Sequence, residues 1–120
     1  MGCARSAHTF HLSGSITASP RIQKRTERPN TVLFIVATNN GGVPVAVARI
    51  INPKLPLHYR MGEEDLVLPG GARREPLTVT VYVNTHGKVG VARRGDLRGV
   101  HRGTVHAGDR HVNIVIDEAV

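Results

Sequence analysis

Valine alternates with threonine and tyrosine along the segment PLTVTVYVN, residues 76–84, and this pattern constrains the fold more than any other. In an extended chain the three valines lie on one face, whereas the two threonines and Tyr82 lie on the other. β-branched side chains lose rotamer freedom in a helix but pack well on a pleated sheet. The segment therefore predicts a β-strand with one buried face.

Six further segments predict strands, because each either alternates with a period of two or is apolar over the length of a strand. Gly, Pro or Asn residues separate most of them, as expected for tight turns. These segments are residues 10–17, 31–38, 43–51, 57–61, 89–91 and 111–117. About seven short strands with turns between them predict an all-β fold, an antiparallel β-sandwich.

Two of these strands have predictable places in the sandwich. Residues 31–38, TVLFIVAT, are apolar on both faces and predict a central strand that is covered on both sides. The NNGG turn that follows pairs this strand with residues 43–51 as a hairpin. Residues 57–61 follow Pro53 and Pro56, whose missing amide donors favour an edge strand.

Three connecting segments are polar or rich in turn residues. Residues 21–30 predict a surface crossover with one helical turn near Ile22. The acidic residues 63–65 predict a solvated turn, and PGGARREP, residues 69–76, predicts a loop.

The length of 120 residues suits one domain, for which we expect the bounds 9–120 after a disordered tail at 1–8. Aromatic residues make up only 3% of the chain, so the core must consist mainly of Val, Ile, Leu and Ala. No apolar run reaches the roughly 20 residues that span a bilayer, and no signal-peptide core is present. The start MGCARS matches a lipidation pattern at Gly2 and Cys3, although a terminal tail explains it more simply.

A net charge of +7 makes nucleic-acid or other anion binding the main rival to protein recognition. The basic residues form three groups in the sequence: Arg21, Lys24, Arg25 and Arg28; Arg73 and Arg74; and Arg93, Arg94, Arg98 and Arg102. Binding of a single strand also needs exposed aromatic platforms, and the chain has only two Phe and two Tyr. We therefore rank nucleic acid below a protein partner.

Seven histidines raise the alternative of a copper or other metal site, for which His101, His106 and His111 are the weak candidates. No blue-copper arrangement is predicted, because Cys3 lies in the tail and Met61 stands alone. The sequence also contains no catalytic triad spacing, phosphate-binding glycine loop or metalloprotease helix. We accordingly expect neither a cofactor nor an enzyme.

The order of several motifs resembles the C-terminal immunoglobulin-like domain of the CcmI/CycH cytochrome c biogenesis proteins. The motifs are SGSIT, TVLFIVAT, VPVAVARI, LPLHYRMGEEDLVLPG, TVTVYVNTHGKV, GDLRG and VNIVID, which together extend from about Leu12 to Asp117. The resemblance implies an immunoglobulin-like sandwich in the periplasm, tethered to the membrane through a leader or a lipidated Cys3. It also implies a protein partner, either apocytochrome c or the haem-ligation machinery.

The family has a shared turn where this chain reads GDLRG. We interpret Gly95, Asp96, Leu97 and Gly99 as a structural turn in which Gly supplies an unusual dihedral, Asp caps the turn and Leu97 points inward. The candidate partner surfaces are the predicted edge strand, with Leu57 and Tyr59, and the arginine-rich segment. In that segment the candidates are Arg93, Arg94, Arg98 and Arg102.

Overall fold

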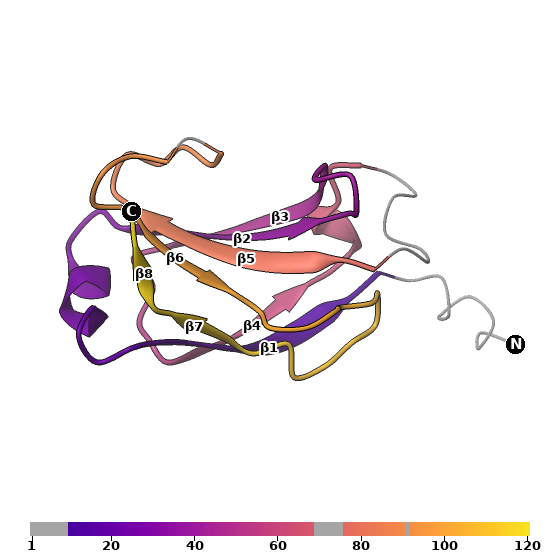
Figure 1. Cartoon of the computed structure of the whole chain (residues 1–120), viewed down its shortest axis with the longest axis horizontal. Helices are drawn as coiled ribbons and strands as arrows, with labels where there is room; N and C mark the ends of the chain where they lie inside the picture. The colour runs from indigo at the N-terminus through magenta and orange to yellow at the C-terminus, as the bar shows by residue number, and fades with distance from the viewer. Residues whose placement is uncertain (1–9, 69–75, 91) are drawn as a thin grey trace, which may run out of the picture.

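The computed structural model describes residues 10–68, 76–90 and 92–120, which form eight strands and two short 3₁₀ helices (Figure 1). The strands are β1 (Leu12–Ala18), β2 (Val32–Thr38), β3 (Pro44–Ile51), β4 (Leu57–Met61), β5 (Thr78–Asn84), β6 (Leu97–Val100), β7 (Ile114–Ile116) and β8 (Glu118–Ala119). The helices are η1 (Gln23–Glu27) and η2 (Glu63–Asp65). The tail predicted at 1–8 and most of the loop predicted at 69–76 lie outside the described residues.

The strands form two sheets that face each other (Figure 1). One sheet has the order β4-β1-β7 and the other β3-β2-β5-β6-β8. All pairings are antiparallel except that of β1 with β7, which is parallel. The predicted all-β sandwich is therefore confirmed, with eight strands where about seven were expected.

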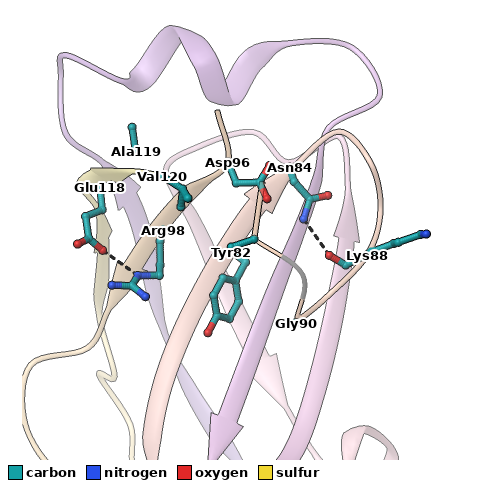
Figure 2. Close-up of a pocket in the computed structure, with 10 residues that line it drawn as sticks. Tyr82, Asn84, Lys88, Gly90, Asp96, Arg98, Glu118, Ala119 and Val120 are labelled. Carbon is teal, nitrogen blue, oxygen red and sulfur yellow. Dashed lines mark hydrogen bonds and ion pairs between the residues drawn. The ribbon is translucent and has the colours of Figure 1, made fainter. Parts of the chain in front are cut away.

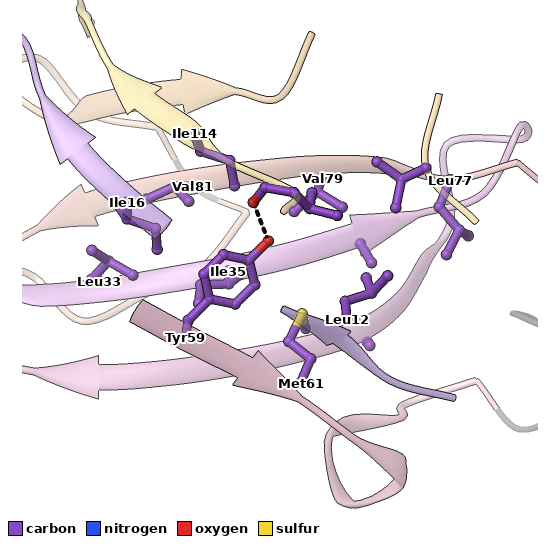
Figure 3. Packing of buried hydrophobic residues seen from close by; sticks show 14 of the residues in the cluster. Leu12, Ile16, Leu33, Ile35, Tyr59, Met61, Leu77, Val79, Val81 and Ile114 are labelled. Atoms are coloured by element: carbon purple, nitrogen blue, oxygen red, sulfur yellow. Dashed lines mark hydrogen bonds between the residues drawn. The ribbon is translucent and has the colours of Figure 1, made fainter. Parts of the chain in front are cut away.

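Side chains from both sheets fill the space between them (Figure 3). Alternate residues of the predicted alternating strand point inward, so that Val79 and Val81 have no exposed surface. Tyr59 and Met61 of β4 also lie in this core, and the Tyr59 hydroxyl donates a 2.7 Å hydrogen bond to the carbonyl oxygen of Val112. Burial of the phenol raises the pKa of Tyr59.

The prediction of a strand at 89–91 is wrong. Val89 lies in a turn, and Val91 is outside the described residues. The strand that pairs with β5 is instead β6, which begins at Leu97, within the segment predicted as a turn. Two valines separated by one residue have the period of a strand, but Gly87 and Gly90 have positive φ, and residues 89 and 90 form a turn.

The prediction that β2 is a central strand covered on both sides is confirmed, because β3 and β5 flank it and residues 33–37 are all buried. Phe34 and Val36 are 5% and 4% exposed, yet neither belongs to the core cluster between the sheets. In the described part of the chain no third layer packs on this face, and the register places side chains of β3 and β5 on either side of it. The outer residues of β2 are therefore covered laterally by neighbouring side chains.

The last strands connect the two layers, because β7 pairs with β1 in one sheet and β8 pairs with β6 in the other. The crossing brings β7 against β6 so closely that a Cβ atom on Gly99 would lie 2.3 Å from the carbonyl oxygen of Val115. Only glycine lets two backbones approach to this distance. The C-terminal segment thus ends beside the β5–β6 loop (Figure 1).

Candidate partner-recognition site

A recess of about 390 Å³ opens on the outer face of the five-stranded sheet, between the β5–β6 loop and β8 (Figure 2). We call it the loop recess. The side chains and backbone that line it come from β5, the loop, β6 and the C-terminal residues: Tyr82, Asn84, Lys88, Gly90, Ala92, Asp96, Arg98, Glu118, Ala119 and Val120. Small ligands and single side chains commonly bind in concavities of roughly 300–1,000 Å³.

The floor of the recess is part of a row of side chains that crosses all five strands. The register pairs Arg49 with Phe34, Phe34 with Tyr82, Tyr82 with Arg98, and Arg98 with Glu118. Arg98 Nε donates a 2.7 Å hydrogen bond to Glu118 Oε1, and this contact raises the pKa of Arg98. The row presents one half-buried aromatic ring between an ion pair and a buried phenylalanine.

Asn84 holds the first part of the loop that covers the recess. Its Oδ1 accepts a 2.8 Å hydrogen bond from the Gly87 amide, and its Nδ2 donates to the Lys88 carbonyl oxygen at 3.2 Å (Figure 2). The side chain is 6% exposed, so these bonds satisfy polar atoms that would otherwise be buried without partners. The loop therefore leaves β5 in a defined direction.

The second part of the loop is held by His86 and Asp96. His86 Nε2 lies 2.8 Å from Asp96 Oδ2, and both side chains are 13% exposed. The Lys88 amide donates to His86 Nδ1 at 3.2 Å, which assigns the proton of the neutral ring to Nε2. Together with Asn84, this pair ties the two ends of the loop to each other.

Asp96 also shapes the turn that precedes β6. Its Oδ2 accepts a 2.9 Å hydrogen bond from the Arg93 amide, and its own amide donates to the Arg93 carbonyl oxygen at 3.0 Å. Gly95 has a φ of +96°, which favours glycine. The turn is shorter than the sequence motif, because Leu97 and Gly99 already belong to β6, with Leu97 only 2% exposed.

The four arginines predicted to contact a partner lie in two separate places. Arg93 and Arg94 are exposed in the loop turn, and Arg98 lies on the recess floor. Arg102 is exposed after β6, away from the recess. The sequence did not distinguish it from the others, because spacing along the chain does not show where a strand ends.

The predicted edge strand is β4, which lies at the edge of its sheet. Leu57 is half-buried, but Tyr59 is 4% exposed and points into the core, so its side chain is not a partner contact. The period of two that identified this strand also places Tyr59 on the same face as Met61, the inner one. The free edge of β4 offers its main chain instead.

The structure does not bring the three candidate histidines together. In the described ranges no three His, Cys, Asp or Glu side chains gather as metal ligands. His101 Nδ1 lies 2.8 Å from the Asn113 carbonyl oxygen, and His106 and His111 are exposed. The segment that carries them extends from one sheet to the other. Val105 forms a β-bridge with Leu77, and the Val112 amide donates a hydrogen bond to the Ser13 carbonyl oxygen.

Sequence reasoning missed Asn84 and His86 as residues that build the site. His86 directly precedes the turn residue Gly87, and Asn84 ends a strand, a position from which a side chain can cap the following loop. This signal was present in the sequence. The row that includes Tyr82 and Arg98 could be found only from the register of β5 and β6.

The topology and the recess define the class of protein, an immunoglobulin-like β-sandwich with a recess above one sheet. The chain belongs to the family of the cytochrome c-type biogenesis protein H Ig-like domain, whose model matches residues 12–117. Its role is therefore related to cytochrome c biogenesis.

The chain is also similar in sequence to a bacterial protein. An uncharacterized protein of Aquifex aeolicus (strain VF5) is 25% identical over 109 residues, which cover 90% of this chain and 71% of that protein. No solved structure matches the chain significantly. None of the helices among the described residues has the length and apolar character that crossing a membrane requires.

Proposed function

We propose that this chain is a non-catalytic recognition domain that binds a protein partner during cytochrome c biogenesis. The partner is apocytochrome c or a protein of the haem-ligation machinery, and the domain acts in the periplasm. The observation that carries the proposal is the family match over residues 12–117, which covers nearly every strand of the sandwich.

The loop recess is the surface that best suits this role. Its floor has a half-buried aromatic ring and an ion pair, and its walls include Ala92, Ala119 and Val120. A tyrosine beside an arginine is a combination that binding interfaces favour. The loop that covers the recess is fixed by Asn84 and by the His86–Asp96 pair, so little ordering is needed when a partner segment binds.

The test is capture of the domain by immobilised peptides that together cover an apocytochrome c sequence. Ala92→Tyr places a large side chain at the wall of the recess, and Thr104→Tyr places the same side chain at an exposed position near the opposite end of β5. We expect Ala92→Tyr to weaken capture at least tenfold, whereas Thr104→Tyr binds like the unmodified chain.

Two results would contradict the proposal in different ways. If no peptide retains the folded domain, apocytochrome c is not its partner. If peptides are retained equally by both variants, the recess is not the binding surface, and the free edge of β4 becomes the surface to test.

A further inference from the structure

A second, smaller hollow lies beside the loop recess, and three of its ten lining residues are arginines. It measures about 110 Å³ and is formed by the segment that includes η1, the end of β5, and the turn before β6. Its cationic side chains are Arg25, Arg28 and Arg94. We call it the arginine cleft.

The cleft joins two of the basic groups that are far apart in the sequence. Arg25 Nη2 donates a 2.9 Å hydrogen bond to the Gly95 carbonyl oxygen, which connects η1 to the turn over a separation of 70 residues. Arg25 is half-buried, whereas Arg28 and Arg94 are exposed. Figure 1 shows η1 and the β5–β6 loop at the same end of the sandwich.

The arginines of the cleft form no ion pair with another described residue. Among the described residues, Arg98 and Glu118 form an ion pair, and His86 contacts Asp96 through a hydrogen bond of its neutral ring. Asp96 lines the cleft, but its Oδ2 already contacts His86 and the Arg93 amide. Three arginines and one carboxylate thus line the cleft, and none of the three arginines forms an ion pair with a described residue, which leaves the cleft suited to an anion.

We propose that the arginine cleft binds a carboxylate side chain of a polypeptide partner. The hollow is small, about 110 Å³, and three arginines line it, which suits a compact anionic group such as a carboxylate. Guanidinium groups bind carboxylates through paired, charge-assisted hydrogen bonds. Arg25, fixed by Gly95, sets the position of the cleft, and Arg28 and Arg94 close on the ligand.

The recess and the cleft together define the chemistry of the bound segment. They share Asn84 and Asp96 in their linings, so one extended segment can reach both. An acidic residue would enter the cleft while a neighbouring apolar residue covers Tyr82 in the recess. This inference rests on the proposed function for its partner class, a protein, and adds that the partner carries an acidic residue beside an apolar one.

Nucleic acid is the rival ligand, because phosphate also binds arginine. A strand of nucleic acid would need exposed aromatic side chains on which its bases stack. Phe10, Phe34 and Tyr59 are buried, and Tyr82 is half-buried on the recess floor. Polypeptide is therefore the ligand that the described surface favours.

The experiment uses a fluorescein-labelled peptide amide of three Glu-Leu repeats, titrated with the full chain and followed by fluorescence anisotropy. The matched probes are the Gln-Leu peptide and a labelled six-nucleotide single strand. Arg28→Gln with Arg94→Gln removes two exposed cations from the cleft, and Arg60→Gln with Arg110→Gln removes two exposed cations elsewhere. Both double variants keep the Arg25–Gly95 contact, and their unfolding midpoints are measured as a control for folding.

We expect the Glu-Leu peptide to bind at least tenfold more tightly than the Gln-Leu peptide. The cleft double variant should lose at least tenfold in affinity, and the control double variant less than threefold. In a ¹H–¹⁵N spectrum the peptide should shift the Arg25 and Gly95 signals.

Three results would overturn the inference. They are absence of binding, equal loss in both double variants, and an oligonucleotide that binds more tightly than the peptide and depends equally on the cleft. Binding of apocytochrome c peptides to the same variants distinguishes a failure of this inference from a failure of the proposed function. If these peptides bind the cleft double variant and the unmodified chain with equal affinity, the arginine cleft is not a binding site for the partner. The proposed function then stands without it.

Discussion

Gly14 of β1 lies where the backbone of another segment comes directly against it. A Cβ atom at this position would be 2.1 Å from the carbonyl oxygen of Val112. We expect Gly14→Ala to lower the free energy of unfolding by roughly 1–3 kcal/mol, because backbone must move to admit the methyl group. Gly41→Ala is the control, since the nearest atom to its Cβ would be Asn39 Oδ1 at 3.5 Å. Urea unfolding of both variants measures the difference, and equal stability would show that the approach is not tight.

Tyr59 is the second residue whose surroundings predict a measurable effect. Removal of the hydroxyl in Tyr59→Phe leaves the Val112 carbonyl oxygen without this partner in the core, at a cost of about 1–3 kcal/mol. The raised pKa means that the folded state favours the neutral phenol. Its contribution to stability is therefore complete below the unfolded pKa of about 10 and is lost as the pH rises above it.

The alkaline part of this prediction is checked by absorbance at the wavelength of tyrosinate. The unmodified chain should show a tyrosine that ionises only as the protein unfolds, and Tyr59→Phe should lack this phase. A late phase that persists in Tyr59→Phe would assign it to Tyr82 instead.

At the scale of elements, the β5–β6 loop depends on Asp96. Asp96→Ala removes both the turn cap at Arg93 and the contact with His86, so we expect faster exchange of the loop amides and a wider loop recess. Asp109→Ala is a matched control, because Asp109 Oδ2 caps the His106 amide at 2.9 Å in an equivalent turn. Hydrogen exchange should show loosening of residues 86–93 only in Asp96→Ala. Equal protection of that loop in both variants would mean that His86 and Asp96 do not hold it.

Strands in which apolar residues alternate with polar ones could be predicted from the sequence. Strands that exist only because they pair with a distant strand could not. The alternation of β5 and the prolines before β4 identified both elements, because one buried face and a missing amide donor are local properties. β8 has two residues and exists through its pairing with β6. Such a strand has no period of its own.

The candidate site was predicted only in part, for a related reason. The arginines and the Gly-Asp turn were visible as residue types, but their grouping depends on where η1 docks. In that contact Arg25 donates to the Gly95 carbonyl oxygen. Because every residue has a backbone carbonyl group, the sequence does not indicate which one accepts the hydrogen bond. Asn84 and His86 act through hydrogen bonds inside one loop, so a careful reading of the turn could have found them.

At the scale of the molecule, one core and one shared segment join the two sheets. The core cluster includes residues of both layers, and the chain passes from β7 in one sheet to β8 in the other with only Asp117 between them. Separate unfolding of either sheet would expose the inner face of the other. We therefore expect the described residues to unfold in a single cooperative transition.

The two tyrosines allow this cooperativity to be tested, because Tyr59 belongs to the three-stranded sheet and Tyr82 to the five-stranded sheet. The chain has no tryptophan, so the fluorescence of Tyr82→Phe reports Tyr59 alone and that of Tyr59→Phe reports Tyr82 alone. In each variant the fluorescence and the far-ultraviolet circular dichroism should change at the same urea concentration, even though the two variants differ in stability. A fluorescence change in Tyr82→Phe that precedes the loss of circular dichroism would show that the β4-β1-β7 sheet detaches first. The connection through β7 and β8 would then be too weak to make the sandwich one folding unit.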